Sequence, residues 1–102
     1  MTLTEIRRRL DELGMRPSRR LGQNFLHDQN LAQRIVALAE IPPDTPLLEI
    51  GPGLGALTEF LPPPASRLTL IEKDRRLAAF LRERFPDARL IEGDALQEIS
   101  HF

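Results

Sequence analysis

Residues 47–58 read LLEIGPGLGALT, a short apolar run that leads directly into three alternating glycines. The first four residues fit a buried β-strand, and Gly51, Gly53 and Gly55 follow it. Because glycine has no Cβ, the chain can turn sharply there and let a ligand approach the backbone. The stretch therefore predicts a strand, a ligand-binding turn and the start of a helix. A tight turn without a ligand is the alternative.

The same alternation of strand and helix continues toward the C-terminus. A helix through residues 56–61 is closed by the three prolines at 62–64, and apolar strands are predicted at 68–71 and 88–91. Between these strands, Asp74 can cap a helix whose apolar side carries Leu77, Leu81 and Phe85. Strands that alternate with helices predict an α/β fold with a parallel sheet and right-handed crossovers.

Two helices are predicted before the first strand. Thr2 and Glu5 fit a capping box for the first, and Gly14 ends it. Its apolar residues are Leu3, Ile6, Leu10 and Leu13. Asp28 can cap the second, whose apolar stripe is Leu31, Ile35, Leu38 and Ala39. We divide the chain into an N-terminal helix and basic arm at 1–27 and the first half of a cofactor-binding domain at 28–102.

Composition and charge narrow the class of protein. The 102 residues include no cysteine, and His27 and His101 are far apart, so disulfides and thiolate metal sites are excluded and we predict no metal. No apolar run reaches membrane-spanning length, and we expect a cytoplasmic protein without a membrane partner. Residues 1–27 carry six arginines against three acidic residues, whereas the remainder carries eight basic and twelve acidic residues. This arm fits an RNA partner, and a solvated helix face is the alternative.

Acidic residues follow the second and third predicted strands, at the edge where open parallel sheets bind ligands. Glu72 ends the second strand, and its carboxylate can accept hydrogen bonds from both hydroxyls of a ribose. A surface glutamate that pairs with Lys73 or Arg75 is the alternative. Asp94 follows the third strand and can accept from the exocyclic amine of adenine. Its alternative role is to cap a helix that starts at Ala95.

Two cofactors fit such a site. Gly51, Gly53 and Ala56 also satisfy the dinucleotide pattern, so the glycines alone do not exclude NAD. Three features favour S-adenosylmethionine: a separate acid at Asp94, two helices before the first strand, and Glu49 just before the glycines. A carboxylate at Glu49 would oppose a pyrophosphate but can accept from the ammonium group of a methionine.

Four segments together resemble the ribosomal RNA adenine N6,N6-dimethyltransferases. They read LGQNFL at 21–26, LEIGPGLGALT at 48–58, IEKD at 71–74 and EGDAL at 92–96. This family includes the bacterial small-subunit enzyme linked to kasugamycin sensitivity, which residues 19–26 resemble most, and the erythromycin-resistance methylases. The resemblance implies a partial Rossmann-like class I methyltransferase fold, S-adenosylmethionine as cofactor and the RNA of the small ribosomal subunit as partner.

The resemblance also implies roles for single residues. In such proteins the arm at Asn24 and Leu26 folds over the methionine part of the cofactor. Gly51 and the turn through Gly53 contact methionine and ribose, Glu72 takes the ribose hydroxyls and Asp94 takes the adenine amine. Composition and spacing alone indicate a turn residue at Asn24 and a core residue at Leu26.

One signature of the family is missing from the sequence. Its catalytic Asn-Leu/Ile-Pro-Tyr/Phe motif does not occur in the 102 residues, so we assign no catalytic residue. We expect a chain truncated after the third strand, inactive alone, with one edge of the first strand bare. The alternatives in other functional classes are a non-catalytic RNA- or ribosome-binding module and an NAD-dependent oxidoreductase. The oligomeric state stays open.

Overall fold

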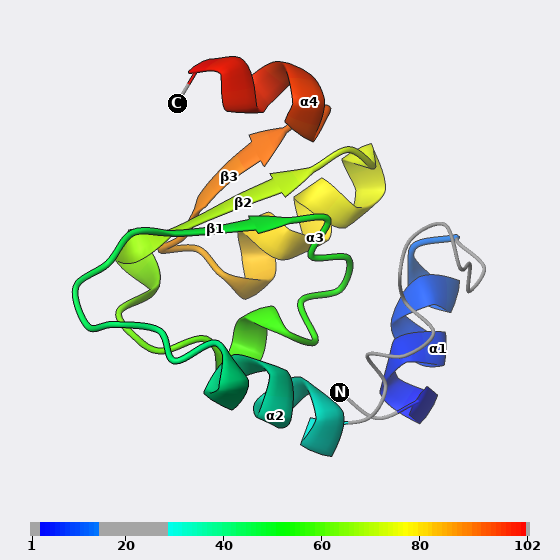
Figure 1. The fold of residues 1–102 in the computed structure, drawn as a ribbon. Helices are drawn as coiled ribbons and strands as arrows, with labels where there is room; N and C mark the ends of the chain where they lie inside the picture. The colour runs from blue at the N-terminus through cyan, green and yellow to red at the C-terminus, as the bar shows by residue number, and fades with distance from the viewer. Residues whose placement is uncertain (1–2, 15–28, 102) are drawn as a thin grey trace.

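The computed structural model describes residues 3–14 and 29–101, which form a three-stranded sheet with helices around it (Figure 1). The elements in chain order are α1 (Leu3–Glu12), α2 (Gln29–Leu38), β1 (Leu47–Ile50), the 3-10 helices η2 (Thr58–Phe60) and η3 (Ala65–Arg67), β2 (Leu68–Glu72), α3 (Arg75–Arg84), β3 (Arg89–Glu92), α4 (Ala95–Glu98) and η4 (Ile99–His101). The three predicted strands are therefore confirmed.

The sheet has the order β1-β2-β3, and both strand pairs are parallel, as the sequence predicts. β2 is central and the most buried strand, with Leu70 at 0% and Ile71 at 1% exposure. α3 makes the crossover from β2 to β3 and contacts both strands. All three strands run toward the side of the molecule on which α1 lies (Figure 1). This arrangement brings the three strand ends to one edge of the sheet.

α1 is attached to the sheet domain through an apolar cluster. Leu10 is completely buried and packs with Leu54 and Ala56, from the segment after β1, and with Leu77 of α3. Gly14 has a φ of +68°, the left-handed conformation that glycine adopts at helix ends, so the predicted end of α1 is confirmed. The predicted cap Thr2 lies outside the described residues.

The predicted packing face of α2 is wrong. Leu31 and Ile35 are each 40% exposed and Leu38 is 77% exposed, whereas Ala32 is completely buried. Ala32 and Val36 lie one turn apart on the inner face, and the helix contacts η2. The covered face of α2 thus carries the small Ala32, and the larger leucines of the predicted stripe lie on the exposed side. The predicted cap Asp28 lies outside the described residues.

The helix predicted at 56–61 is also wrong in type, because only the 3-10 turn η2 forms there. Gly55 has a φ of +83°, so a right-handed helix can start only after it. At the other end, the residue before a proline is pushed out of the helical region, and Leu61 precedes Pro62 with a ψ of 141°. Only residues 56–60 remain between these limits, and the chain forms the short 3-10 turn η2 there.

α3 follows its prediction closely. The Asp74 Oδ1 atom accepts hydrogen bonds from the backbone N–H groups of Arg76 (2.8 Å) and Leu77 (3.1 Å), which caps the helix. Leu77 and Leu81 are completely buried, and the helix ends at Arg84, shortly before Pro86.

One face of β1 is uncovered among the described residues. Leu48 is 45% and Ile50 54% exposed, and β1 is an edge strand, so the predicted bare edge is confirmed for this part of the chain. Glu49 points to the opposite face, because side chains alternate along a strand. Within residues 3–14 and 29–101, no helix has the length and apolar character needed to cross a membrane.

The contrast between Leu10 and Leu38 gives a test of this packing. Leu10→Ala should lower the free energy of unfolding by about 2–5 kcal/mol, because it leaves a cavity in the α1 cluster. Leu38→Ala makes the same chemical change at an exposed site and should change it by less than about 0.5 kcal/mol. Urea denaturation followed by far-UV circular dichroism measures both. Equal losses would contradict the described packing of α1 and α2.

Candidate functional site

The polar residues predicted for a ligand site meet at the carboxyl edge of the sheet. The Gly51 N–H donates to the Ile71 carbonyl (2.8 Å), and the Gly93 N–H donates to the Glu72 carbonyl (3.0 Å). These bonds continue the strand pairing past the ends of β1 and β3 and fix the following turns to β2. The glycine turn, Glu72 and Asp94 are therefore neighbours in space, as predicted from the order of strands.

The three glycines of the turn have positive φ values and different surroundings. The φ angles are +66° at Gly51, +61° at Gly53 and +83° at Gly55, a region that residues with a Cβ rarely adopt. A Cβ built on Gly51 would meet no atom within 4 Å, so this residue borders open space. A Cβ on Gly55 would lie 2.5 Å from Cε2 of Phe85. Gly51 thus leaves room for a ligand, and Gly55 leaves room for the ring of Phe85.

Glu72 holds the glycine turn in place. Its side chain is buried, with 4% exposure. Oε1 accepts from the Gly53 N–H (3.1 Å), and Oε2 accepts from the Asp74 N–H (2.9 Å). The alternative of a surface glutamate is therefore wrong. Each carboxylate oxygen has two acceptor positions, so each keeps capacity for one further donor.

Asp94 caps α4 and keeps one oxygen for another partner. Oδ1 accepts from the Leu96 N–H (2.8 Å), so the capping role left open by the sequence is confirmed. Oδ2 lies 3.9 Å from Nζ of Lys73, whose side chain is 81% exposed. A pair of this length at the surface binds weakly. The cap therefore occupies Oδ1, while Oδ2 faces the weakly bound, exposed side chain of Lys73, which the amine of a ligand can replace.

Glu49 lies on the covered side of β1 and supports η2. The buried Thr58 hydroxyl donates a hydrogen bond to Glu49 Oε1. Burial raises the pKa of the Glu49 carboxyl above its ordinary value of 4.5, and the bond from Thr58 partly offsets this rise. The contact with a methionine ammonium predicted from the sequence stays a prediction.

Arg84 holds the glycine turn on the side away from Glu72, a contact that we did not predict from the sequence. Its guanidinium donates from Nη1 to the Leu54 carbonyl and from Nη2 to Glu59 Oε2. It also lies over the ring of Phe85, 5.0 Å from the centroid. Thirty residues separate Arg84 from Leu54, so no local spacing signals the contact.

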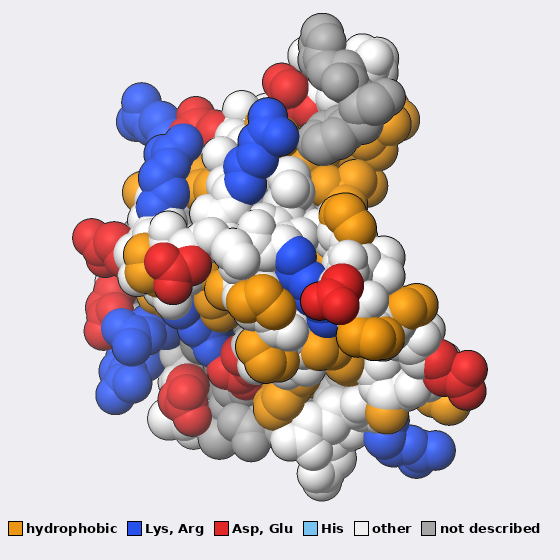
Figure 2. Space-filling model, turned by 90° about the vertical axis from the view of Figure 1, so that its left-hand side faces the viewer, with side chains coloured by type: hydrophobic (Ala, Val, Ile, Leu, Met, Phe, Trp, Pro, Cys, Tyr) orange, Lys and Arg blue, Asp and Glu red, His pale blue; other side chains and the backbone are white. Residues whose placement is uncertain are grey.

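Some of the residues predicted from the sequence lie outside the described part of the chain. These are Asn24, Leu26 and most residues of the predicted basic arm. Figure 2 shows the face at the amino ends of the strands, where basic and acidic side chains are interspersed with hydrophobic ones. On this view the described residues present no continuous basic surface. The described residues also hold no group of three or more potential metal ligands.

A comparison of two glycines separates packing from backbone strain. Gly51→Ala and Gly55→Ala should each cost about 1–2 kcal/mol of stability from the positive φ. Gly55→Ala should cost about 1–3 kcal/mol more, because its Cβ overlaps the ring of Phe85. Thermal unfolding monitored by circular dichroism ranks the two variants. A Gly51→Ala variant as unstable as Gly55→Ala would contradict the described position of Phe85.

The half-buried Glu49 predicts a pH-dependent stability. Its folded pKa is raised, so its contribution is fully present below about pH 4.5 and is lost as pH rises through the folded pKa. Glu49→Gln cannot ionise, so its unfolding free energy relative to the parent chain should increase between about pH 4 and about pH 8. Urea titrations at both pH values measure the difference. The exposed Glu83→Gln is the control, and an identical pH dependence in both variants would count against burial of Glu49.

Comparison with known proteins identifies the family. The family model described as ribosomal RNA adenine dimethylase matches residues 14–98. Among curated proteins, the chain is 49% identical over 78 residues to the ribosomal RNA small subunit methyltransferase A of Chlorobium phaeobacteroides, covering 76% of this chain and 29% of that protein. It is 42% identical over 95 residues to the protein of the same name from Prosthecochloris aestuarii, covering 93% and 36%.

A third curated relative and a solved structure agree. The Corynebacterium glutamicum protein of the same name is 51% identical over 81 residues, covering 79% of this chain and 28% of the relative. The crystal structure of the 23S rRNA methyltransferase ErmE superposes with a TM-score of 0.60 at 42% identity, covering 71% of this chain and 31% of that one.

These matches decide between the readings of the glycine turn. The chain spans between 28% and 36% of the length of these three curated relatives. The predicted partial Rossmann-like methyltransferase fold is confirmed, and neither an oxidoreductase nor a non-catalytic module is favoured. The chain belongs to the ribosomal RNA adenine dimethylase family.

Proposed function

We propose that the protein transfers methyl groups from S-adenosylmethionine to N6 of adenines in small-subunit ribosomal RNA, and that the present residues bind the cofactor. One observation carries the proposal. In a chain of this family, an open-sided Gly51, a buried Glu72 and a half-buried Asp94, whose Oδ2 is paired with exposed Lys73 at 3.9 Å, meet at one edge of the sheet. This edge is where α/β sheets bind nucleosides.

The described residues fit the adenosine half of the cofactor. The spare acceptor positions of Glu72 suit the two ribose hydroxyls, which are donors. Asp94 Oδ2 suits the adenine amine, because the α4 cap occupies only Oδ1. The open space at Gly51 lets the ligand reach the backbone, and Gly53 holds the turn through its bond to Glu72.

The methionine half rests on the family resemblance. We propose that Asn24 and Leu26, in the arm within 1–27, cover this part of the cofactor, and that 28–102 form the first half of the cofactor-binding domain. The sulfonium of the bound cofactor supplies the methyl group. The role of this chain's residues is to orient that group, since positioning contributes much of the rate in a transfer to a weak nucleophile.

The identity of the RNA rests on the relatives. Three curated relatives carry a small-subunit name, and the solved structure is of a 23S rRNA methyltransferase, so both kinds of ribosomal RNA occur among similar proteins. We propose small-subunit RNA as the substrate and the cytoplasm as the location. The Asn-x-Pro-aromatic motif for the target base is not among the 102 residues, so we expect these residues to bind cofactor without methylating RNA.

Asp94→Asn tests the assigned adenine contact. Asparagine keeps the helix cap, because its carbonyl oxygen can accept from the Leu96 N–H, but it presents an amide donor to the adenine amine. Affinity for S-adenosylmethionine, measured by isothermal titration calorimetry, should fall about 5- to 100-fold, the range expected when polar groups in a site lose their partner. Asp87→Asn, at an exposed site, should bind like the parent chain.

Ligand changes complete this test. The parent chain should prefer adenosine to inosine, which has a carbonyl oxygen in place of the amine, and Asp94→Asn should reduce that preference. It should also prefer adenosine to 2′-deoxyadenosine if Glu72 takes the ribose hydroxyls. Tight binding of NAD with no binding of S-adenosylmethionine would overturn the proposed function. Binding of RNA without any cofactor would support a non-catalytic module instead.

A further inference from the structure

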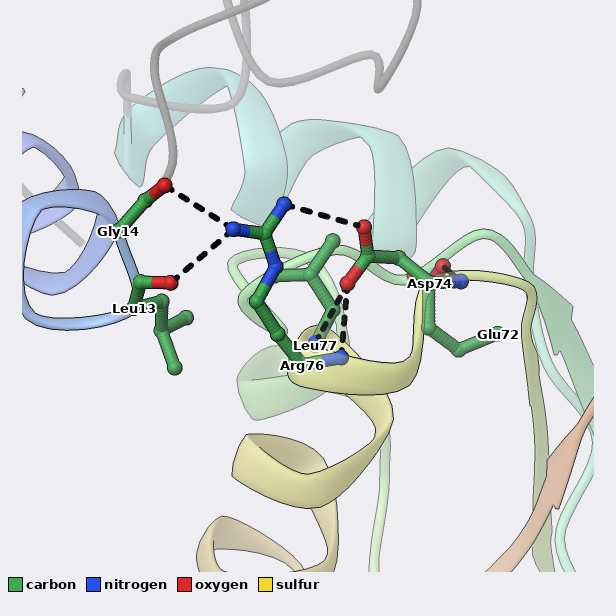
Figure 3. A network of polar contacts seen from close by, with 6 residues as sticks. All are labelled: Leu13, Gly14, Glu72, Asp74, Arg76 and Leu77. Carbon is green, nitrogen blue, oxygen red and sulfur yellow. Dashed lines mark hydrogen bonds and ion pairs between the residues drawn. The ribbon is translucent and has the colours of Figure 1, made fainter.

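A chain of polar contacts runs from the end of α1 through Arg76 and Asp74 to Glu72 (Figure 3), and Glu72 binds the Gly53 amide of the glycine turn. Arg76 lies at its centre. Its Nη1 atom donates to the carbonyl oxygens of Gly14 (3.0 Å) and Leu13 (3.4 Å), at the C-terminal end of α1. Its Nη2 atom lies 3.9 Å from Oδ2 of Asp74. More than sixty residues separate Arg76 from the carbonyl groups it contacts.

Arg76 supplies hydrogen-bond donors and positive charge at the C-terminal end of α1, where a helix lacks both. The last carbonyl groups of an α-helix have no partner within the helix, and they carry the negative end of its dipole. A guanidinium offers several N–H donors in a fixed plane together with a positive charge. Arg76 therefore binds the two carbonyl groups that directly follow α1 and places its positive charge near the negative end of the helix dipole.

The contacts continue from Arg76 into the candidate site. Oδ2 of Asp74, whose side chain is 23% exposed, faces the guanidinium at 3.9 Å, and Oδ1 caps α3. Its backbone N–H donates to Oε2 of Glu72 (2.9 Å), and Oε1 of Glu72 accepts from the Gly53 N–H (3.1 Å). A movement of Asp74 would thus change the position of Glu72, and through it the turn that borders the ligand.

Packing alone leaves this end of α1 only partly fixed. A hollow of about 300 Å³ lies between α1 and α3, lined among others by Leu13, Arg76 and Phe80. The buried anchor of α1, Leu10, lies one turn earlier. Leu13 packs against the same apolar cluster but is only partly buried, and the two carbonyl contacts of Arg76 add polar bonds to this end of α1.

We propose that Arg76 is a positioning residue: it ties the C-terminal end of α1 to Asp74 and thereby orients the Glu72 carboxylate and the Gly53 amide for the nucleoside. This role rests on the proposed function for its effect on the cofactor. Its effect on the glycine turn is independent of any ligand. α1 then belongs to the machinery of the site although none of its described residues lies at the strand ends.

The experiment compares three variants of the whole chain. Arg76→Met removes the donors and keeps much of the aliphatic stem, and Arg76→Lys keeps the charge with a single donor group. Arg75→Met is the matched control, because Arg75 is the preceding residue on α3 and is exposed. Far-UV circular dichroism verifies folding. If Arg76→Met does not fold, Arg76→Lys decides, with a smaller change in the same direction.

The first measurement is amide hydrogen exchange by NMR without ligand. Arg76→Met should speed exchange of the Gly53 amide about threefold to tenfold, the range for a half-exposed hydrogen-bonded link. The amide of Leu81, within α3, should keep its rate, and Arg75→Met should match the parent chain. Unchanged exchange at Gly53, or equal acceleration at Gly53 and Leu81, would overturn the positioning role.

The second measurement is the affinity for S-adenosylmethionine. It should weaken about threefold to tenfold in Arg76→Met, less in Arg76→Lys and not at all in Arg75→Met. If the parent chain and all variants bind equally well, the positioning role is wrong while the proposed function stands. If the parent chain does not bind, the proposed function fails, and exchange at Gly53 still decides whether Arg76 positions the turn.

Discussion

The buried carboxylate of Glu72 connects the parts of this structure that come from different segments of the chain. It ends the central strand, accepts from the turn after β1 through Gly53 and accepts from the start of α3 through Asp74. A carboxylate loses its hydration when it is buried, and hydrogen bonds from N–H donors are what makes the burial tolerable. The Gly53 amide therefore stabilises the buried Glu72 carboxylate, and Glu72 in turn holds the glycine turn in place. The shape of the ligand edge follows from this mutual requirement.

The glycine turn is held on two sides by different kinds of interaction. On the ligand side, Glu72 binds the Gly53 amide. On the other side, Phe85 packs against Gly55 and Arg84 reaches the Leu54 carbonyl. The turn is thus held between a carboxylate and the end of α3, and Gly51 faces open space. Pre-organisation of this kind favours binding, because the turn loses little further freedom when a ligand arrives.

The features that could be predicted from the sequence are those with local causes. Strand positions, the cap at Asp74 and the end of α1 at Gly14 each depend on a few neighbouring residues, and all agree with the structure. The packing face of α2 could not be predicted, because the helix contacts η2, a distant segment, and the buried residue is the small Ala32 rather than one of the larger apolar residues. The contacts of Arg84 and Arg76 join residues far apart in the chain, so spacing gave no indication of them.

The uncovered face of β1 sets a physical condition on the candidate site. Leu48 and Ile50 are about half exposed, and β1 has a partner on one side only. Gly51 follows Ile50 directly, so the glycine turn begins at an edge strand of the sheet. Its bond to the Ile71 carbonyl ties it to β2, the best buried strand. The site consequently draws its rigidity from β2 and α3 rather than from β1. An edge strand that frays would therefore disturb Gly51 first and Glu72 last, because Gly51 directly follows β1 whereas Glu72 ends the central strand.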